Sequence, residues 1–388
     1  MPPPARPRSR DLALAIAASA AFVVLAPAIG ELRRWLRVSF PGRFVAIVAA
    51  GTVIAGAAAL AVALRRIRDR RAWRFGAIAL AIAIAVVYSV RTSLGNPESD
   101  VVEHVHFLEY GLVTWLFYRA WTPLGDASAL LLAMMAALTV GTCEEGLEWF
   151  VPARIGELRD IFLNMAAIVS GALFSWALRP VPMRVVRSAR SERAVLVVAA
   201  VALAALAAFV DTVHIGHEIH DADGRTFRSI YMADDLRALS AARRQQWAAH
   251  PPLERPARYS REDQYASEGL WHVQERNALW SRQEFSASLH ENRLLEEFYA
   301  PVLDAPSYVS RTGHRWPPEQ VAEGARRSAE SSIDARHFVS GAQGEFPIFI
   351  WSRSAFRMWS GLIVLALLAA AVVAGRRLDY PVSEGAHE

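Results

Sequence analysis

The sequence predicts an all-α integral membrane protein with about eight transmembrane helices and a mainly helical extracytoplasmic domain inserted before the last helix. Three observations lead to this class. Hydrophobic residues make up 53% of the chain, against about 45–50% in an ordinary soluble domain. They cluster in nearly uncharged runs of about 17–22 residues, the length that crosses a hydrocarbon core of roughly 30 Å. All 42 basic residues are Arg, and many lie in short segments between those runs.

The spans are expected at about 11–29, 44–64, 75–91, 105–121, 128–149, 161–178, 194–212 and 356–375. Short segments on one side of the membrane carry 17 Arg and those on the other side carry seven. Cytoplasmic loops hold the excess of basic residues, so we expect both termini to be cytoplasmic. The predicted location is the cytoplasmic (inner) membrane of a bacterium, with residues 213–355 outside it and the lipid bilayer as a partner.

Five parts follow from this topology. We expect an N-terminal transmembrane hairpin, a transmembrane core, a cytoplasmic loop with helix 7, an extracytoplasmic soluble domain, and helix 8 with a short tail. Their expected bounds are 1–74, 75–180, 181–212, 213–355 and 356–388. The soluble domain holds 17 Arg against 20 Asp plus Glu, a net charge of −3, which leaves +7 elsewhere. Because a nucleic-acid reader places its basic patch on a soluble face, no nucleic acid is expected as a partner.

Helix signals dominate the soluble domain. Helices are expected at 233–248 and from Pro317-Pro318 to about 331, since Pro suits the first turn of a helix. Ser260 and Ser281, each followed three residues later by an acidic residue, resemble capping boxes. They predict helices near 261–280 and 282–299. Short strands are expected at 226–231 and 346–351.

Ionisable residues occur in or beside three predicted spans, where they are costly and usually face a bundle interior or a cavity. The first set consists of Glu103, His106, Glu109 and Tyr110. The spacing of Glu103, His106 and Tyr110 places these three on one face of a helix. The second set spans the end of the fifth predicted span and the start of the sixth. Its members are Glu144, Glu145, Glu148, Arg154, Asp160 and Asn164. The topology brings both sets to the outer ends of neighbouring helices.

These residues resemble the motifs of the VanZ-like family, named for a teicoplanin-resistance accessory protein. Its first motif is matched by Glu103, His106, Phe107, Glu109 and Tyr110. Its second motif is matched by Glu145, Pro152, Arg154, Asp160, Asn164 and Gly171. The resemblance covers about residues 75–180. Glu148 stands where the family usually has Gln, and Ala167 stands where it often has Gly. Residues 213–355 look like an extension found on some members.

The resemblance implies a cell-envelope membrane protein with a link to glycopeptide antibiotic resistance. We expect it to bind an envelope lipid head group or a lipid-linked cell-wall glycan precursor at the outer leaflet. The expected ligand-binding residues are those of the two sets other than Glu144, namely Glu103, His106, Glu109, Tyr110, Glu145, Glu148, Arg154, Asp160 and Asn164. Three other functions stay open for those residues. They are a polar network that joins helices, a membrane-embedded hydrolase or transferase with His106 as acid–base, and a structural anchor for residues 213–355.

A second run of interest is His214-x-x-His217-x-x-His220. On a helix, His217 would neighbour both other histidines, and zinc takes such ligands. The run directly follows a predicted span, where such side chains are common at the membrane interface, so it is only a weak metal candidate. His272-x-x-Glu275-Arg276 is expected on a solvated or salt-bridged helix face. No cofactor is predicted, because phosphate-loop, haem-attachment and zinc-protease motifs do not occur.

Overall fold

The structure is a computed structural model that describes residues 8–93, 97–150, 156–183, 188–249, 264–306, 310, 312–330, 337–342 and 347–379. The chain forms two compact units. Unit 1 contains Met1–Glu148, Leu158–Phe209 and Arg357–Glu388, and unit 2 contains Trp149–Glu157 and Val210–Phe356.

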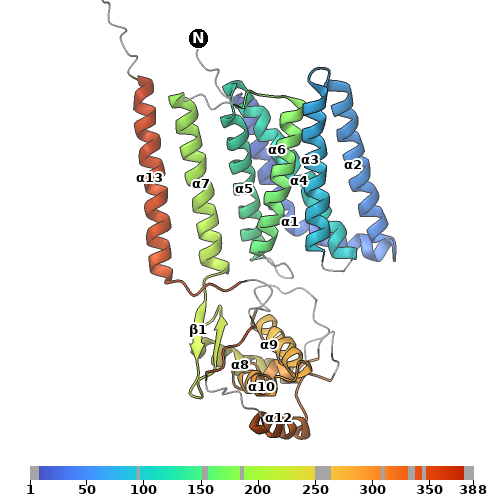
Figure 1. Ribbon diagram of the computed structural model, residues 1–388, viewed down its shortest axis with the longest axis vertical. Helices are drawn as coiled ribbons and strands as arrows, with labels where there is room; N and C mark the ends of the chain where they lie inside the picture. Colours follow the sequence, from blue (N-terminus) through green and yellow to red (C-terminus); the bar gives the residue numbers. More distant parts are fainter. Residues whose placement is uncertain are drawn as a thin grey trace, which may run out of the picture. The chain divides into compact units, whose positions relative to one another are not determined.

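Long helices make up unit 1 (Figure 1). The first four helices of the chain are α1 (Ser9–Ser39), α2 (Phe44–Arg66), α3 (Arg71–Thr92) and α4 (Pro97–Trp121). A 3₁₀ turn at Thr122–Leu124 leads into the later helices. These are α5 (Ser128–Glu148), α6 (Leu158–Leu178), α7 (Ala189–Val213) and α13 (Arg353–Asp379), of which α7 and α13 extend into unit 2.

Seven helices of the described chain are long and apolar enough to cross a bilayer: α1, α2, α3, α5, α6, α7 and α13. The chain is therefore a multi-pass α-helical membrane protein, as predicted. The predicted span at 105–121 lies in α4, which is not among the seven. Its first half carries Glu98, Asp100, Glu103 and Glu109, and this charge lowers its hydropathy below that of its neighbours.

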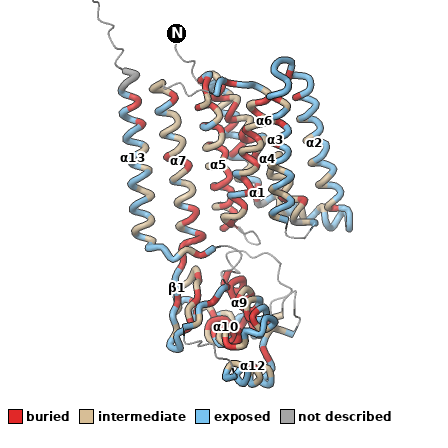
Figure 2. The backbone as a smooth tube through the Cα atoms, in the orientation of Figure 1, coloured by how far each residue is buried: buried red, intermediate tan, exposed pale blue. Residues whose placement is uncertain are grey.

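The long helix that is not among these seven packs against the most neighbours. Helix α4 contacts α1, α2, α3, α5 and α6, and α6 also packs on α3 and α5. Figure 2 shows buried residues concentrated on α4, α5 and α6, whereas α2 is largely exposed. Tyr110, Phe117, Leu132, Ala137 and Ile168 belong to the apolar core of the unit. Because the core surrounds α4, its polar side chains meet other helices.

The closest approach between α4 and α6 is at two glycines. A methyl group at position 171 would lie 2.6 Å from the Cα of Gly111. A methyl group at position 111 would lie 4.0 Å from the Cα of Gly171, which is ordinary contact. Small residues let helix backbones approach closely in membranes. Here the approach brings the polar faces of α4 and α6 within hydrogen-bonding range.

Polar groups at the other end of this bundle are also paired. Arg74 on α3 donates from Nε to the carbonyl of Ala177 at 2.7 Å and from Nη2 to that of Leu178 at 3.0 Å. Carbonyl groups at a helix C-terminus have no partner within the helix, so Arg74 satisfies this end of α6. Arg119 on α4 donates to Asp11 on α1 at 2.9 Å.

We expect Gly171→Ala to destabilise unit 1 by about 1–3 kcal/mol, because the added methyl group must push the α4 backbone away. Gly111→Ala is the matched control and should be close to neutral. Thermal unfolding in detergent, followed by circular dichroism, measures both. Equal stability of the two variants would contradict the close contact between the backbones.

Unit 2 is mainly helical, as predicted. Two strands, β1 (His217–His220) and β2 (Thr226–Ser229), pair antiparallel. The helices are α8 (Ala233–Ala249), α9 (Gln264–Ser281), α10 (Phe285–Phe298), α11 (Ala300–Asp304) and α12 (Pro318–Glu330). Helices α8, α9, α10 and α12 correspond to the expected helices within a few residues, whereas α11 and β1 are not among the expected elements. Strand β2 lies in the expected strand at 226–231.

Three local predictions for unit 2 either differ from the structure or lie wholly or partly outside the described residues. Ser281 is not a capping residue, because it is the last residue of α9 and its hydroxyl donates to the carbonyl of Asn277 at 3.0 Å. The capping box at Ser260 lies outside the described residues. The strand expected at 346–351 is described only from residue 347, where Phe349 forms an isolated parallel bridge to Ile215.

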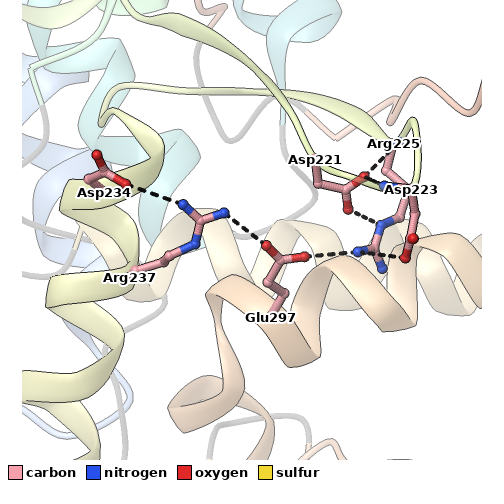
Figure 3. Close-up of polar contacts among 6 residues, drawn as sticks. All are labelled: Asp221, Asp223, Arg225, Asp234, Arg237 and Glu297. Carbon is pink, nitrogen blue, oxygen red and sulfur yellow. Dashed lines mark hydrogen bonds and ion pairs between the residues drawn. The ribbon is translucent and has the colours of Figure 1, made fainter.

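A chain of ion pairs fixes the β1–β2 turn to α10 and α8 (Figure 3). Arg225 is buried, bonds Asp221 through Nε, and donates from Nη2 to Glu297 at 2.8 Å. The other oxygen of Glu297 accepts from Arg237 on α8 at 3.0 Å. The Asp221 carboxylate also accepts the backbone N–H of Arg225 at 2.9 Å. The turn is therefore held by its own backbone and by a side chain of α10.

Arg276 is the largest fully buried side chain of the described residues. Its guanidinium donates to Asn292 Oδ1 at 2.8 Å and to the carbonyl of His314 at 2.7 Å, and it lies 4.6 Å from the centre of the Trp316 ring. Burial lowers the pKa of Arg276 to about 10. Of the two expected alternatives, the solvated helix face is therefore wrong for Arg276 and for His272, which is also buried. His272 Nδ1 does lie 2.9 Å from a carboxylate oxygen of Glu291, as the salt-bridged alternative predicts.

Arg276→Lys should destabilise unit 2 by about 1–3 kcal/mol, because an ammonium group cannot keep both hydrogen bonds and the stacking on Trp316. Arg282→Lys, at an exposed residue directly after the end of the same helix, is the matched control and should change little. Protease cleavage within residues 210–356 of the full-length protein reports the difference. If both variants are cleaved equally slowly, Arg276 does not stabilise the unit.

Candidate functional site

Polar side chains from three helices meet at one end of unit 1. They come from the first half of α4, the last turns of α5 and the first turns of α6. We call them the polar cluster, which consists of Glu103, His106, Glu109, Tyr110, Glu144, Glu145, Arg159 and Asn164. The sequence predicts that these helix ends meet, and the contacts among their residues agree.

Three contacts tie α4 to its neighbours. His106 Nδ1 lies 3.0 Å from Asn164 Oδ1 on α6. The Tyr110 hydroxyl donates a hydrogen bond to Glu144 on α5. Arg159 donates to Glu103 at 2.5 Å. Residues 103, 106 and 110 therefore face α5 and α6 together, as their spacing predicts.

The Tyr110 hydroxyl is surrounded by acidic groups. Besides Glu144, to which it is bonded, Glu145 and Glu109 lie within electrostatic range of it. Glu145 is 1% exposed and Tyr110 is 2% exposed. In the hydrocarbon region a charged group is stable only with a partner or with water. The carboxylates named above make this end of the bundle rich in hydrogen-bond acceptors.

The other predicted site residues are placed as follows. Asp160 and Glu148 are buried at the same helix ends. Asp160 lies within electrostatic range of the Tyr88 hydroxyl, as do Glu103 and Arg159. Arg154, the predicted cation of the site, lies outside the described residues, as does Pro152 of the same motif.

Two partners were missed as site residues by sequence reasoning. Arg159 was counted only as a basic residue of an outer segment, and it is the described partner of Glu103. Glu144 was noted beside Glu145 without a role, and it is the partner of Tyr110. A signal exists for Arg159: it directly precedes Asp160 and lies five residues before Asn164, so it lies in the first turn of the helix that carries Asn164.

Gly141 on α5 makes room for the centre of the cluster. A methyl group at this position would lie 3.1 Å from Asn164 Nδ2 and 3.1 Å from Cε1 of Tyr110. Asn164 is completely buried. Its Nδ2 atom has no hydrogen-bond partner among the described residues. The amide therefore has an oxygen with a partner and an NH₂ group without one among the described residues.

The helical arrangement considered for His214, His217 and His220 is wrong. His217 and His220 lie on strand β1, whereas His214 precedes the strand and is fully buried. His214 Nδ1 lies 2.9 Å from the carbonyl of Pro347, and its ring packs against Phe349. In the described parts of the chain, no three His, Cys, Asp or Glu side chains are placed to hold a metal ion. His214 thus connects two segments of unit 2.

Unit 2 contains a buried Ser, His and Glu that sequence reasoning did not group. Ser340 donates to Glu291, and His272 Nδ1 lies 2.9 Å from the other oxygen of Glu291. Ser340 Oγ also lies 3.4 Å from the same Nδ1 atom. In a hydrolase triad the serine and the acid use opposite nitrogens of the histidine. Here both use Nδ1, so the group joins the segment at 337–342 to α9 and α10.

Protonation of buried histidines should destabilise unit 2 at low pH. Burial lowers the pKa of His214, despite the opposing hydrogen bond to Pro347, and burial also lowers the pKa of His290. The unfolded chain, with an ordinary histidine pKa of about 6.5, therefore binds more protons below that pH. The contribution of these neutral histidines to the free energy of unfolding is therefore fully present above about pH 6.5 and is lost as the pH falls below it.

The rate of protease cleavage within residues 210–356 should rise as the pH is lowered from 7.5 to 5. Each rate is divided by the rate for an unfolded peptide at the same pH. His214→Gln should flatten this dependence, because the Gln amide can donate to the Pro347 carbonyl without titrating. His217→Gln alters an exposed histidine and should leave the profile unchanged. A flat profile for the unaltered protein would show that His214 does not couple to folding.

Comparison with protein-family models, with curated proteins and with solved structures finds no match to this chain. Its function is therefore inferred from its own residues and their geometry.

Proposed function

We propose that the protein binds the head group of an envelope lipid, or of a lipid-linked glycan precursor, at the polar cluster. The observation that supports this proposal most is that buried polar side chains from α4, α5 and α6 meet at one end of the bundle. Polar and ionisable groups inside a membrane usually mark a pathway or a binding site. The resemblance of residues 75–180 to VanZ-like proteins supports a place in the cell envelope and remains part of the proposal.

The topology makes a lipid a suitable ligand. With both termini cytoplasmic, the polar cluster lies at the outer leaflet and residues 213–355 lie outside the membrane. We include α4 as an eighth span, because it packs among the helices that are apolar enough to cross. A head group would reach the cluster from the bilayer surface while its acyl chains stay among the lipids. The head group would then meet hydrogen-bond acceptors, the carboxylates of the polar cluster, as well as donors, its N–H and O–H groups.

Native mass spectrometry of the protein in mild detergent tests the proposal. The unaltered protein should retain a lipid, whereas His106→Ala and Glu144→Gln should lose it. Gln still offers an oxygen to Tyr110, so the fold should survive the second change. His104→Ala is the matched control, since His104 lies on the same helix two residues from His106 and makes no contact with Asn164.

Circular dichroism and thermal unfolding of the same variants separate binding from folding. The same lipid retained by all four proteins would exclude the cluster as its site. Absence of lipid from all four, with reduced stability only in the two cluster variants, would show that the cluster serves solely to join helices.

A further inference from the structure

Helix α1 is longer than a membrane span needs. Its 31 residues extend over about 46 Å at 1.5 Å per residue, whereas the hydrocarbon core of a bilayer is roughly 30 Å thick. The part of α1 that is apolar enough to cross runs from Ser9 to Ala26. Residues 28–39 continue the helix and include one Glu and three Arg, which are costly inside the hydrocarbon core. This second part of α1 therefore lies outside that core.

The second part of α1 and the turn that follows it have an apolar face. We call residues 28–43 the α1 end segment. Leu32, Trp35 and Leu36 are three or four residues apart, so they are neighbours on one side of the helix. Leu32 is 53% exposed and Trp35 is 57% exposed. The Trp35 ring contacts Phe40 edge-on, with 6.0 Å between the ring centres. The apolar face thus continues from the helix into the turn.

The opposite side of the α1 end segment is basic. Arg33, Arg34 and Arg37 have helical spacing that places them together, away from Leu32. Arg34 pairs with Glu31 at 3.1 Å, and both side chains are exposed. Exposed ion pairs are weak and exchange readily with other partners. The segment holds four Arg against one Glu, so its positive charge exceeds its negative charge.

Contacts with two other helices fix the α1 end segment in place. Arg37 Nη2 lies 3.0 Å from a carboxylate oxygen of Glu98 in the first turn of α4. The guanidinium carbon of Arg37 also lies 5.0 Å from the ring centre of Phe44, the first residue of α2. Gly42 has a φ of 70°, a conformation that glycine adopts at little cost and that closes the turn into α2. The segment is therefore a fixed part of unit 1 with two chemically different faces.

We propose that the α1 end segment lies in the surface of the bilayer and binds anionic phospholipid head groups. A helix with one apolar and one basic face lies in the plane of the interface. The apolar face enters between the acyl chains, and the basic face meets the negative lipid surface. Arg suits this partner because its planar fork of N–H groups matches the oxygens of a phosphate. This inference rests on the multi-pass membrane fold and does not depend on the ligand of the polar cluster.

A fluorescent label in the α1 end segment tests the proposal on the full-length protein in phosphatidylcholine vesicles. The label is attached at Ser39→Cys, four residues after Trp35 on the apolar face, with Cys143→Ala removing the chain's natural cysteine. Brominated phosphatidylglycerol and brominated phosphatidylcholine with identical acyl chains quench a label that they contact. Half-maximal quenching should need an at least about fivefold lower mole fraction of phosphatidylglycerol, the gain expected from one Arg at an anionic surface.

Two controls separate the basic face from general contact with lipid. Arg33→Gln combined with Arg34→Gln should bring the two mole fractions within about twofold, because it removes two cations and leaves Arg37 bonded to Glu98. A label at Ile54→Cys should be quenched equally by both lipids. Ile54 is exposed near the middle of α2, eleven residues from the nearest Arg in either direction.

Every outcome supports or overturns the proposal. Equal quenching of the Ser39 label by the two lipids would overturn the preference for anionic head groups. No quenching by either lipid would show that the segment extends into water. A preference that persists without Arg33 and Arg34 would overturn the role of the basic face. The comparison of the two lipids, made with every Arg in place, decides the inference even if the double Arg variant fails to fold.

Discussion

The structure of unit 1 depends on how the polar face of α4 is satisfied inside an apolar bundle. Glu103, His106 and Tyr110 each bond a residue of another helix. In a bilayer no water replaces a lost partner, so these bonds set both the rotation of α4 and the neighbours it can take. The glycine contact with α6 sets the separation at which the bonds form. Apolar packing of Phe117 and Leu132 completes the core from the other side.

The membrane class could be predicted from the sequence because span length and hydropathy are local properties. The polar face of α4 could be predicted because helical spacing is also local. The pairing of Arg159 with Glu103 could not be predicted, since the two residues are 56 positions apart in the sequence. Nothing in the sequence favours Arg159 over Arg154 as the partner of Glu103. The unsatisfied Nδ2 of Asn164 could not be predicted either, because it depends on how three helices rotate against one another.

Unit 2 shows a different limit of sequence reasoning. Its helices were predicted from Pro positions and from polar-apolar patterns, which act within one segment. His214, His217 and His220 follow helical spacing, yet β1 forms because β2 pairs with it. The polarity of His272 and Arg276 predicts a solvated or salt-bridged helix face. They are buried because Glu291, Asn292 and the carbonyl of His314 supply partners from separate segments.

The order of the chain matters for how α4 reaches its place. Its partners follow it in the sequence by 34 residues for Glu144 and 58 residues for Asn164. During synthesis α4 therefore leaves the ribosome before either partner exists. A segment that carries several ionisable residues partitions poorly into lipid by itself. In the proposed topology, where α4 is an eighth span, the insertion machinery would have to hold α4 until α5 and α6 emerge, so that three helices enter the bilayer as one group.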